Sequence, residues 1–218
     1  MALVSHRKKF IFLKTAKTAG TSVECYFEKY CLPEGEYVFS HQREMHYSEA
    51  GIVGARGPLA KESEWYHHMS ASQIKAKLSD DVWNEYLKFT VVRNPYDKLV
   101  SAFHHFGLSD KNLAKQEKIL LFRNWLKSGG RAIDRNVYTI DNEIVVDEVI
   151  KFESLLEGLE RVCNKLSVAF EPGTLLSLKD HHRKDKSEIA VFFDQESKEI
   201  VESAYQFELQ HFGYSLPL

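Results

Sequence analysis

The feature that most constrains the fold of this chain is a short apolar segment followed by a glycine-containing loop and a helical pattern. Phe10–Leu13 forms the apolar segment, Lys14–Ser22 has the sequence KTAKTAGTS, and a helical pattern covers Ser22–Tyr30. A strand that leads through a loop into a helix is typical of α/β folds. The amides of a first helical turn lack partners within the helix, and the helix dipole favours negative charge there. The segment therefore predicts an anion site.

The residues of this loop are suited to a phosphate. Lys17 adds a positive charge, and Gly20 allows the backbone to approach a ligand closely. Hydroxyl donors come from Thr18, Thr21 and Ser22. Because Lys17 precedes Gly20 and no early glycine opens the loop, the sequence differs from the triphosphate-binding motif G-x-x-x-x-G-K-[ST]. We expect a phosphate held without the usual triphosphate and Mg²⁺ arrangement, and the alternative is an ordinary capped helix start.

Strand-like segments alternate with helical patterns along the rest of the chain. The predicted strands are Phe10–Leu13, Tyr37–Phe39, Phe89–Val92 and Glu148–Phe152. The predicted helices are Ser22–Tyr30, Ser72–Leu78, Tyr96–Phe106, Lys115–Lys127, Ser154–Leu166 and Ser197–Phe212. This alternation predicts an α/β fold with a mostly parallel central sheet flanked by helices, and ligands then bind at the carboxyl ends of the strands. No repeat or linker divides the sequence, so we expect a single domain over residues 1–218.

Composition argues against several classes of protein. With 44% hydrophobic residues and a net charge of −2, the chain resembles an ordinary globular domain without a general attraction for nucleic acid or anionic membranes. Cys25, Cys31 and Cys163 lack metal-ligand spacing, so buried reduced thiols and no metal site are expected. No apolar run approaches the ~18 residues of a membrane helix, and the first strand leaves no room for a signal peptide. We expect a cytoplasmic protein with no membrane span.

A second motif, FTVVRNPYDKLVSAF, covers Phe89–Phe103. Arg93 follows the predicted strand, at the sheet edge where the first loop is also expected, and Asn94 is a good helix cap. Ser101 lies seven residues beyond Asn94, which returns it to nearly the same helix face. The Arg93 guanidinium and the Ser101 hydroxyl could therefore bind one phosphate. The alternative is a surface Arg93 paired with Asp97 and a serine packed between helices.

Together, the two motifs resemble those of sulfotransferases that use 3′-phosphoadenosine 5′-phosphosulfate (PAPS), in particular the carbohydrate branch that includes heparan sulfate 2-O-sulfotransferase. KTAGTS, at Lys17–Ser22, resembles the loop that holds the 5′-phosphosulfate, and VVRNPYDKLVSAF resembles the segment that holds the 3′-phosphate. Their order and separation of about 70 residues also fit. Ala16 departs from the family, which usually has proline there. The resemblance implies a P-loop-like three-layer fold and in-line transfer without a metal.

The resemblance also implies roles for individual residues. Lys17 would stabilise charge on the oxygen that bridges sulfate and 5′-phosphate, while Arg93 and Ser101 would bind the 3′-phosphate. A charged loop, KDHHRKDKSE, resembles the nucleotide-covering loop of the family, although a solvated loop is the equal alternative. The expected nucleotide contacts are Lys14, Lys17, Thr18, Ala19, Gly20, Thr21, Ser22, Arg93, Ser101, Arg183 and Lys186.

The segment WYHHMSASQI, at Trp65–Ile74, resembles the His-x-Ser segment that carries the catalytic histidine of the 2-O-sulfotransferase group. On this match His68 is the base that accepts the hydroxyl proton, and Ser70 caps the next helix. His67 is the rival because the register is uncertain by one residue. A third possibility is that both histidines are surface loop residues.

We interpret the sequence as a PAPS-dependent sulfotransferase that releases PAP, the desulfated nucleotide, and acts on a hydroxyl-bearing acceptor, with a saccharide expected. Two alternatives remain. One is a small-molecule kinase with an unusual P-loop, which would require ATP and Mg²⁺. The other is a non-catalytic module that binds PAP. The sequence does not predict the acceptor or the oligomeric state.

Overall fold

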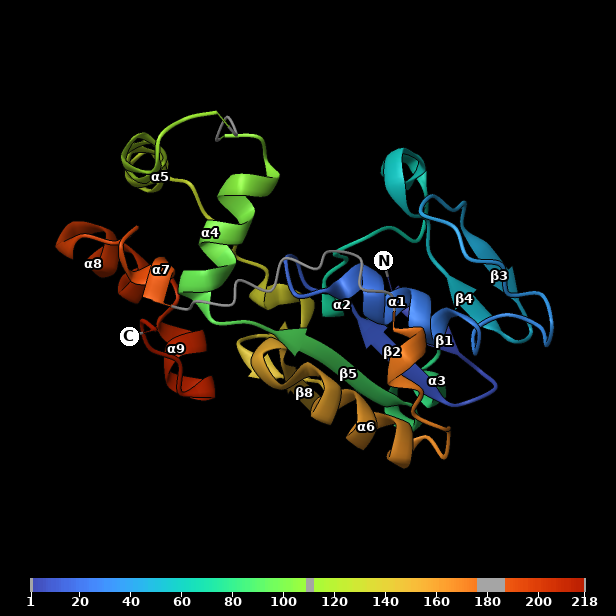
Figure 1. Cartoon of the computed structure of the whole chain (residues 1–218). Helices are drawn as coiled ribbons and strands as arrows, with labels where there is room; N and C mark the ends of the chain where they lie inside the picture. Colours follow the sequence, from blue (N-terminus) through green and yellow to red (C-terminus); the bar gives the residue numbers. More distant parts are fainter. Residues whose placement is uncertain (1, 109–111, 176–186, 218) are drawn as a thin grey trace. The chain divides into compact units, whose positions relative to one another are not determined.

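The computed structural model describes residues 2–108, 112–175 and 187–217 (Figure 1). Contacts divide the chain into two compact units, here called the sheet unit, Met1–Val92 with Asp134–Leu178, and the helical unit, Arg93–Ile133 with Lys179–Leu218. Each unit has a hydrophobic core of its own. The single domain expected over residues 1–218 stays a prediction.

The sheet unit is built on a mixed sheet whose strand order is β3-β4-β1-β2-β5-β8. β2, β5 and β8 pair in parallel, whereas β1, β3 and β4 join through antiparallel pairs. The α/β class is therefore confirmed, but the expectation of a mostly parallel sheet is corrected. The short connection at residues 6–9 between β1 and β2 allows only an antiparallel pair. The strand bounds are β1 Ala2–Ser5, β2 Phe10–Leu13, β3 His46–Ser48, β4 Gly51–Val53, β5 Leu87–Val92 and β8 Glu148–Lys151.

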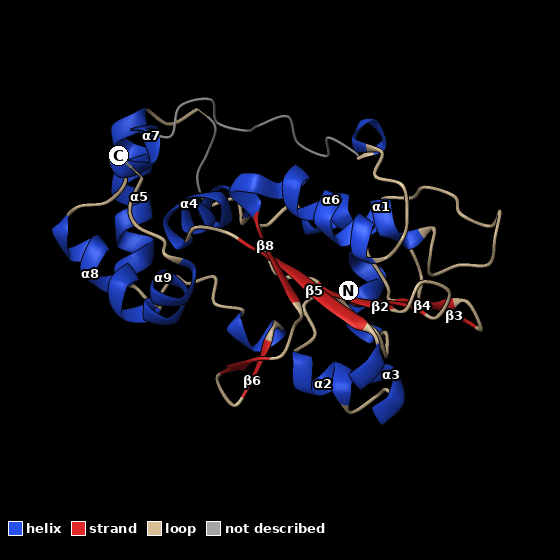
Figure 2. Ribbon diagram, turned by 90° about the horizontal axis from the view of Figure 1, so that it is seen from below, coloured by secondary structure: helices blue, strands red, loops and turns tan. Residues whose placement is uncertain are grey.

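Helices cover both faces of this sheet. Figure 2 shows α1, Gly20–Glu28, and α6, Leu155–Lys165, on one face, with α2, Ala71–Lys75, and α3, Asp80–Glu85, on the other. A small hairpin, β6 Thr139–Ile140 with β7 Glu143–Ile144, contacts α2 through β6. Short 3₁₀ turns complete the unit: η1 Gly57–Glu62, η2 Arg135–Val137, η3 Phe152–Ser154 and η4 Pro172–Thr174.

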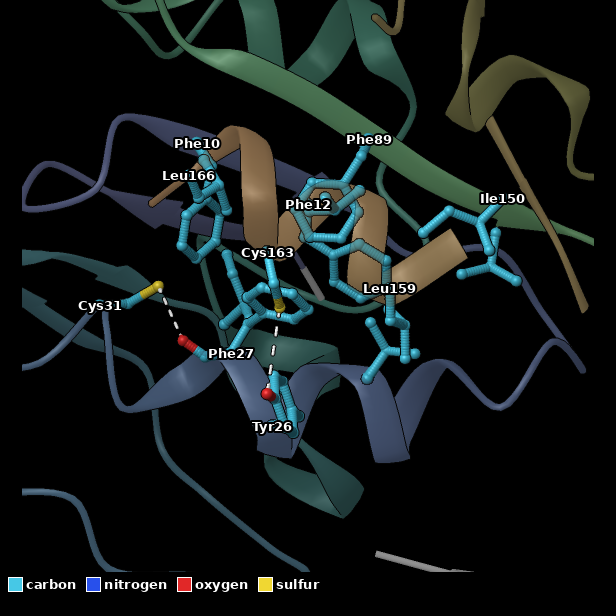
Figure 3. Close-up of a cluster of buried hydrophobic side chains, with 14 of the residues drawn as sticks. Phe10, Phe12, Tyr26, Phe27, Cys31, Phe89, Ile150, Leu159, Cys163 and Leu166 are labelled. Carbon is cyan, nitrogen blue, oxygen red and sulfur yellow. Dashed lines mark hydrogen bonds between the residues drawn. The ribbon is translucent and has the colours of Figure 1, made fainter. Parts of the chain in front are cut away.

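The core of the sheet unit lies between the sheet and the pair of helices α1 and α6 (Figure 3). The rings of Phe12 and Phe89 stack with centroids 5.0 Å apart, and Phe27 of α1 lies 5.1 Å from Phe89. Leu159 and Cys163 of α6 are fully buried against these rings. Each of these buried aromatic and aliphatic side chains stabilises the fold by about 1.5–3 kcal/mol. Together they fix the positions of β2 and β5, and therefore the points at which the following loops begin.

The helical unit consists of α-helices around a second aromatic core. Tyr96, Phe103, Phe122 and Phe193 are buried there, with ring centroids 5.0–5.5 Å apart in three edge-to-face pairs. The helix bounds are α4 Pro95–His105, α5 Lys115–Lys127, α7 Ser187–Ala190, α8 Gln195–Ala204 and α9 Gln206–Phe212.

Two sequence predictions of secondary structure are wrong. Tyr37–Phe39 is not a strand, since the sheet edge is formed by the β3–β4 hairpin and Val38 is exposed. The helix predicted over Ser197–Phe212 is broken at Tyr205, whose backbone φ of −118° ends α8. The buried hydroxyl of Tyr205 accepts a hydrogen bond of 2.7 Å from the amide of Ala132, which fixes that break.

The structure shows the state of the three cysteines and the character of the helices. Cys25, Cys31 and Cys163 are buried free thiols, as the sequence analysis expected. Among the helices in the described ranges, none combines the length and apolar character that crossing a membrane requires.

Candidate functional site

The loop between β2 and α1 has a strained backbone. Lys17 and Ala19 adopt φ angles of 61° and 57°, in the left-handed region that residues other than glycine rarely occupy. Such conformations cost about 1–3 kcal/mol each and persist only where the surroundings enforce them. The strain lies at the position for which the sequence predicts an anion site.

The start of α1 forms the donor end of this loop. The amides of Ser22 and Val23 donate to the Ala19 carbonyl at 2.9 and 3.2 Å, so the helix begins at Gly20. The amides of Gly20 and Thr21 precede these first hydrogen bonds. They are the groups that an anion at a helix N-terminus accepts from.

Buried hydroxyls attach the base of the loop to β5. The Thr15 hydroxyl donates to the Val91 carbonyl, and its oxygen lies 2.9 Å from the Thr18 hydroxyl oxygen. Because Thr15 has one hydroxyl proton, Thr18 is the donor in that second contact. The hydroxyl of Thr18, which the sequence assigned to the nucleotide, therefore donates within the loop.

Asp134 closes the beginning of the loop from a distant part of the sequence. Its Oδ2 accepts a hydrogen bond of 2.6 Å from the amide of Ala16, and the residue is buried just before η2. This contact could not be predicted from the sequence, because Asp134 lies 118 residues from Ala16 and carries no local motif.

Lys14 is turned toward α1. Its ammonium lies 2.7 Å from Glu24 Oε2 and donates to the Thr21 hydroxyl at 3.1 Å. Lys14 and Glu24 are both buried. The Thr21 hydroxyl accepts from Lys14 and thus keeps its own proton for donation. Lys14 ties the loop to α1, and its predicted contact with a nucleotide stays a prediction.

Gly20 leaves room for the Lys14 side chain. A Cβ at Gly20 would lie 2.8 Å from Cγ of Lys14 and 3.2 Å from the Thr15 carbonyl oxygen. We therefore expect Gly20→Ala to lower the free energy of unfolding by about 1–3 kcal/mol, measured by urea denaturation. Gly173→Ala is the matched control, since a Cβ there meets nothing within 4 Å. Equal stabilities of the two variants would contradict this account of Gly20.

The ring of His68 contacts the backbone of the same loop. Its Nδ1 lies 3.0 Å from the Lys14 carbonyl oxygen, and its φ is 62°. A carbonyl only accepts, so Nδ1 carries the proton and Nε2 of the neutral ring has the free lone pair. Burial lowers the pKa of His68 to about 3, and the Lys14 charge contributes in the same direction. The ring is therefore neutral near pH 7.

His67 differs from its neighbour. The side chain of His67 is exposed, and its ring meets that of His68 edge-on, with 5.1 Å between the ring centroids. The neighbouring atoms remove part of the water around the ring, which lowers the pKa of His67. Ser70 caps α2 as expected, because its hydroxyl accepts from the Gln73 amide at 3.2 Å. The contact with Lys14 favours His68 as the base, and its catalytic role stays a prediction.

The pKa of His68 predicts a dependence of stability on pH. The unfolded side chain titrates near 6.5 and the folded one near 3, so the unfolded chain binds more protons between these values. Stability is lost as the pH falls below 6.5. Between pH 7.5 and 5 we expect His68→Asn to remove up to about 2 kcal/mol of the acid-induced loss, measured by urea denaturation at both pH values. An identical loss in both proteins would contradict the assigned pKa.

In the helical unit, Arg93 precedes α4. Asn94 caps this helix, since its Oδ1 accepts from the Tyr96 amide at 3.1 Å. Arg93 donates from Nε to Asp97 Oδ2 at 2.7 Å, and Nη2 lies 2.6 Å from the same oxygen. Asp97 and Ser101 are four residues apart on α4 and thus share a helix face. Arg93 and Ser101 therefore lie along one side of α4, with Asp97 between them in sequence.

Two further predicted contacts lie outside the described residues, namely Arg183 and Lys186. In the described part of the chain, no group of three or more His, Cys, Asp or Glu side chains is arranged to hold a metal ion. Besides Asp134, Thr15 of the loop and Glu24 of α1 were not identified from the sequence, although they attach the loop to β5 and to α1. Only their positions, one within the loop and one two residues after it, could have indicated them.

The comparisons with known proteins assign this chain to a family. The profile of the sulfotransferase family matches residues 1–215. This chain belongs to the sulfotransferase family. An uncharacterised protein of Archaeoglobus fulgidus is 26% identical to this sulfotransferase over 106 residues, which cover 47% of this chain and 86% of that protein. No solved structure matches this chain. Membership supports an enzyme that transfers a sulfuryl group to a hydroxyl-bearing acceptor.

Proposed function

We propose that this sulfotransferase takes its sulfuryl group from PAPS and transfers it to a hydroxyl of a saccharide, as in the heparan sulfate 2-O-sulfotransferase branch that its motifs resemble. The observation that carries the proposal is the 3.0 Å hydrogen bond between His68 Nδ1 and the Lys14 carbonyl. It joins a neutral histidine to the loop with an anion-binding helix start. A proton acceptor beside an anion loop is what sulfuryl transfer to an alcohol requires.

The donor groups of the loop fit a phosphosulfate. The amides of Gly20 and Thr21, which precede the first hydrogen bonds of α1, and the charge of Lys17 suit an anion at the start of this helix. Arg93 follows β5 directly, where a nucleoside triphosphatase would be expected to have a metal-binding carboxylate. These features favour a sulfonated nucleotide over a metal-bound triphosphate. The P-loop-like character of the fold stays part of the proposal.

The proposed step is an in-line displacement at sulfur. The hydroxyl proton of the acceptor passes to Nε2 of His68 while the acceptor oxygen bonds to sulfur. The bond between sulfur and the bridging oxygen breaks, and the 5′-phosphate of PAP keeps that oxygen with its negative charge. Lys17 stabilises this charge, and the amides of Gly20 and Thr21 orient the phosphate.

The low pKa of His68 is compatible with this role. A base must be unprotonated before it accepts a proton, and His68 with a pKa of about 3 is neutral at pH 7. A bound donor brings several negative charges close to the ring. Nearby negative charge favours the protonated imidazole, so the basicity of His68 rises in the complex.

Arg93 and Ser101 are the proposed ligands of the 3′-phosphate. Their placement on one side of α4 supports this assignment, since one phosphate can accept from both. Asp97 already accepts from the Arg93 guanidinium, so this carboxylate orients the fork that a phosphate would share. Arg183 and Lys186 are retained as proposed nucleotide contacts on the resemblance alone.

The test is transfer of labelled sulfuryl groups from PAPS to a panel of saccharide and simple alcohol acceptors, with EDTA present. We expect labelled product and PAP in equal amounts, with chelation having no effect. A kinase with an unusual P-loop would consume ATP and stop on chelation. A non-catalytic module would bind PAP and label no acceptor, and either result would overturn the proposal.

A further inference from the structure

A network of charges, most of them buried, joins Glu24 and Glu28 of α1 to Lys14, Arg43 and Arg56. Glu24 and Glu28 project from α1, one turn apart, and both are fully buried. Glu24 Oε2 lies 2.7 Å from Lys14 Nζ of the loop and 3.5 Å from Arg56 Nη1. Glu28 accepts from Arg56 Nη1 at 3.0 Å and pairs with Arg43. Glu24 is thus the carboxylate through which the loop lysine and Arg56 meet.

Arg56 connects this network to the segment that carries His68. It follows β4 and the preceding residue, Ala55, donates its amide to the Trp65 carbonyl at 2.8 Å. Trp65 is buried and lies three residues before His68. The segment from Arg56 to His68 is therefore attached at one end to α1 and at the other to the Lys14 carbonyl.

Glu24 thus supports the residue that accepts the hydrogen bond orienting the base. Its contact with the Lys14 ammonium holds the residue whose carbonyl accepts from His68 Nδ1. Arg56, at the start of the segment that carries His68, lies 3.5 Å from Glu24 but has its shorter contact, of 3.0 Å, with Glu28. The contact with Lys14 is therefore the one that distinguishes Glu24 from Glu28. Since a buried carboxylate is costly unless paired, both cations keep Glu24 in one position.

We propose that Glu24 is a positioning residue of the reaction: through the Lys14 ammonium it holds the Lys14 carbonyl against His68 Nδ1 and leaves Nε2 free for the acceptor proton. The inference rests on the proposed function for its catalytic meaning. The orientation of His68 is nevertheless measurable without any nucleotide or acceptor. Glu24 itself contacts neither reacting atoms nor the base.

The test is the tautomer of His68 in the full chain, read from the ¹⁵N chemical shifts of its ring near pH 7 and assigned with His68→Asn. In the unmutated protein we expect the Nδ1–H form to dominate, because the Lys14 carbonyl accepts from it. Glu24→Ala should make Nδ1–H the minor form. Glu28→Ala is the matched control, since it removes a buried carboxylate of the same helix that does not contact Lys14, and it should leave the tautomer unchanged.

A second variant keeps the test decisive if Glu24→Ala does not fold. Lys14→Met with Glu24→Leu removes both charges, leaves no unpaired partner of that ion pair, and keeps a similar buried volume. The Nδ1–H form should again become minor. An unchanged tautomer in a folded Glu24→Ala or double variant would overturn the proposal, as would a dominant Nε2–H form in the unmutated protein.

Calorimetric titration of PAP on the same samples separates this inference from the proposed function. If Glu24→Ala changes the His68 tautomer but the unmutated protein does not bind PAP, the positioning role is supported and the assignment of PAPS as the donor is contradicted. If PAP binds and Glu24→Ala leaves the His68 tautomer unchanged, the proposed function is supported and the positioning role is contradicted.

Discussion

His68→Asn is expected to lower the rate of sulfuryl transfer by roughly 10²–10⁴-fold while the affinity for PAP stays nearly unchanged. Asparagine tolerates the left-handed backbone that His68 adopts, at φ 62°, and its amide can still donate to the Lys14 carbonyl. The variant therefore keeps the loop contact and removes only the proton acceptor. Steady-state rates and calorimetric titration of PAP provide the two measurements.

His67→Asn is the matched control for this prediction. His67 is the adjacent, more exposed imidazole, and the contact with Lys14 belongs to His68. We expect His67→Asn to retain most of the activity. If His67→Asn is inactive and His68→Asn is active, the base is His67. If both variants are active, neither histidine is the base.

Lys17→Asn is expected to lower turnover more than tenfold, and up to about 10²–10³-fold, without unfolding the protein. Lys17 has a φ of 61°, which asparagine also tolerates, so the substitution removes the ammonium and leaves the backbone in place. The loss is expected in the rate with saturating PAPS, because the charge on the bridging oxygen grows as its bond to sulfur breaks.

The matched control for Lys17 is Lys75→Asn, which removes an exposed ammonium from α2. It is expected to leave turnover unchanged, whereas its small cost in helix stability appears only in urea denaturation. Unchanged turnover of Lys17→Asn with an acceptor that the unmutated enzyme uses would remove Lys17 from the mechanism.

Local sequence signals predicted the elements that present the site. Phe10–Leu13 and Lys115–Lys127 have the expected bounds, because an apolar run and an amphipathic repeat specify their own secondary structure. Asn94 and Ser70 cap helices as their side chains suggest, and Gly213 ends α9 with a φ of 62°. Capping depends on neighbours in sequence, so it is visible there.

The contacts that hold the site together could not be predicted in the same way. Asp134 meets Ala16 only because the chain returns to the loop after 118 residues, and the Lys14–Glu24 pair depends on how α1 leaves the loop. The edge of the sheet was also misassigned at Tyr37–Phe39, because strand pairing depends on distant partners. Tertiary packing decides all three.

The central claim is that this sulfotransferase recognises PAPS, and its 3′-phosphate distinguishes PAPS from other adenine nucleotides. An arginine contact to that phosphate is worth about 1.5–3 kcal/mol, which corresponds to at least about tenfold in affinity. Calorimetric titration of the unmutated protein and of Arg93→Ala with PAP and with adenosine 5′-phosphate measures this difference directly. We predict that the unmutated protein binds PAP at least about tenfold more tightly and that Arg93→Ala removes most of the preference. Equal binding of the two nucleotides by the unmutated protein would contradict the assignment of PAPS as the sulfuryl donor.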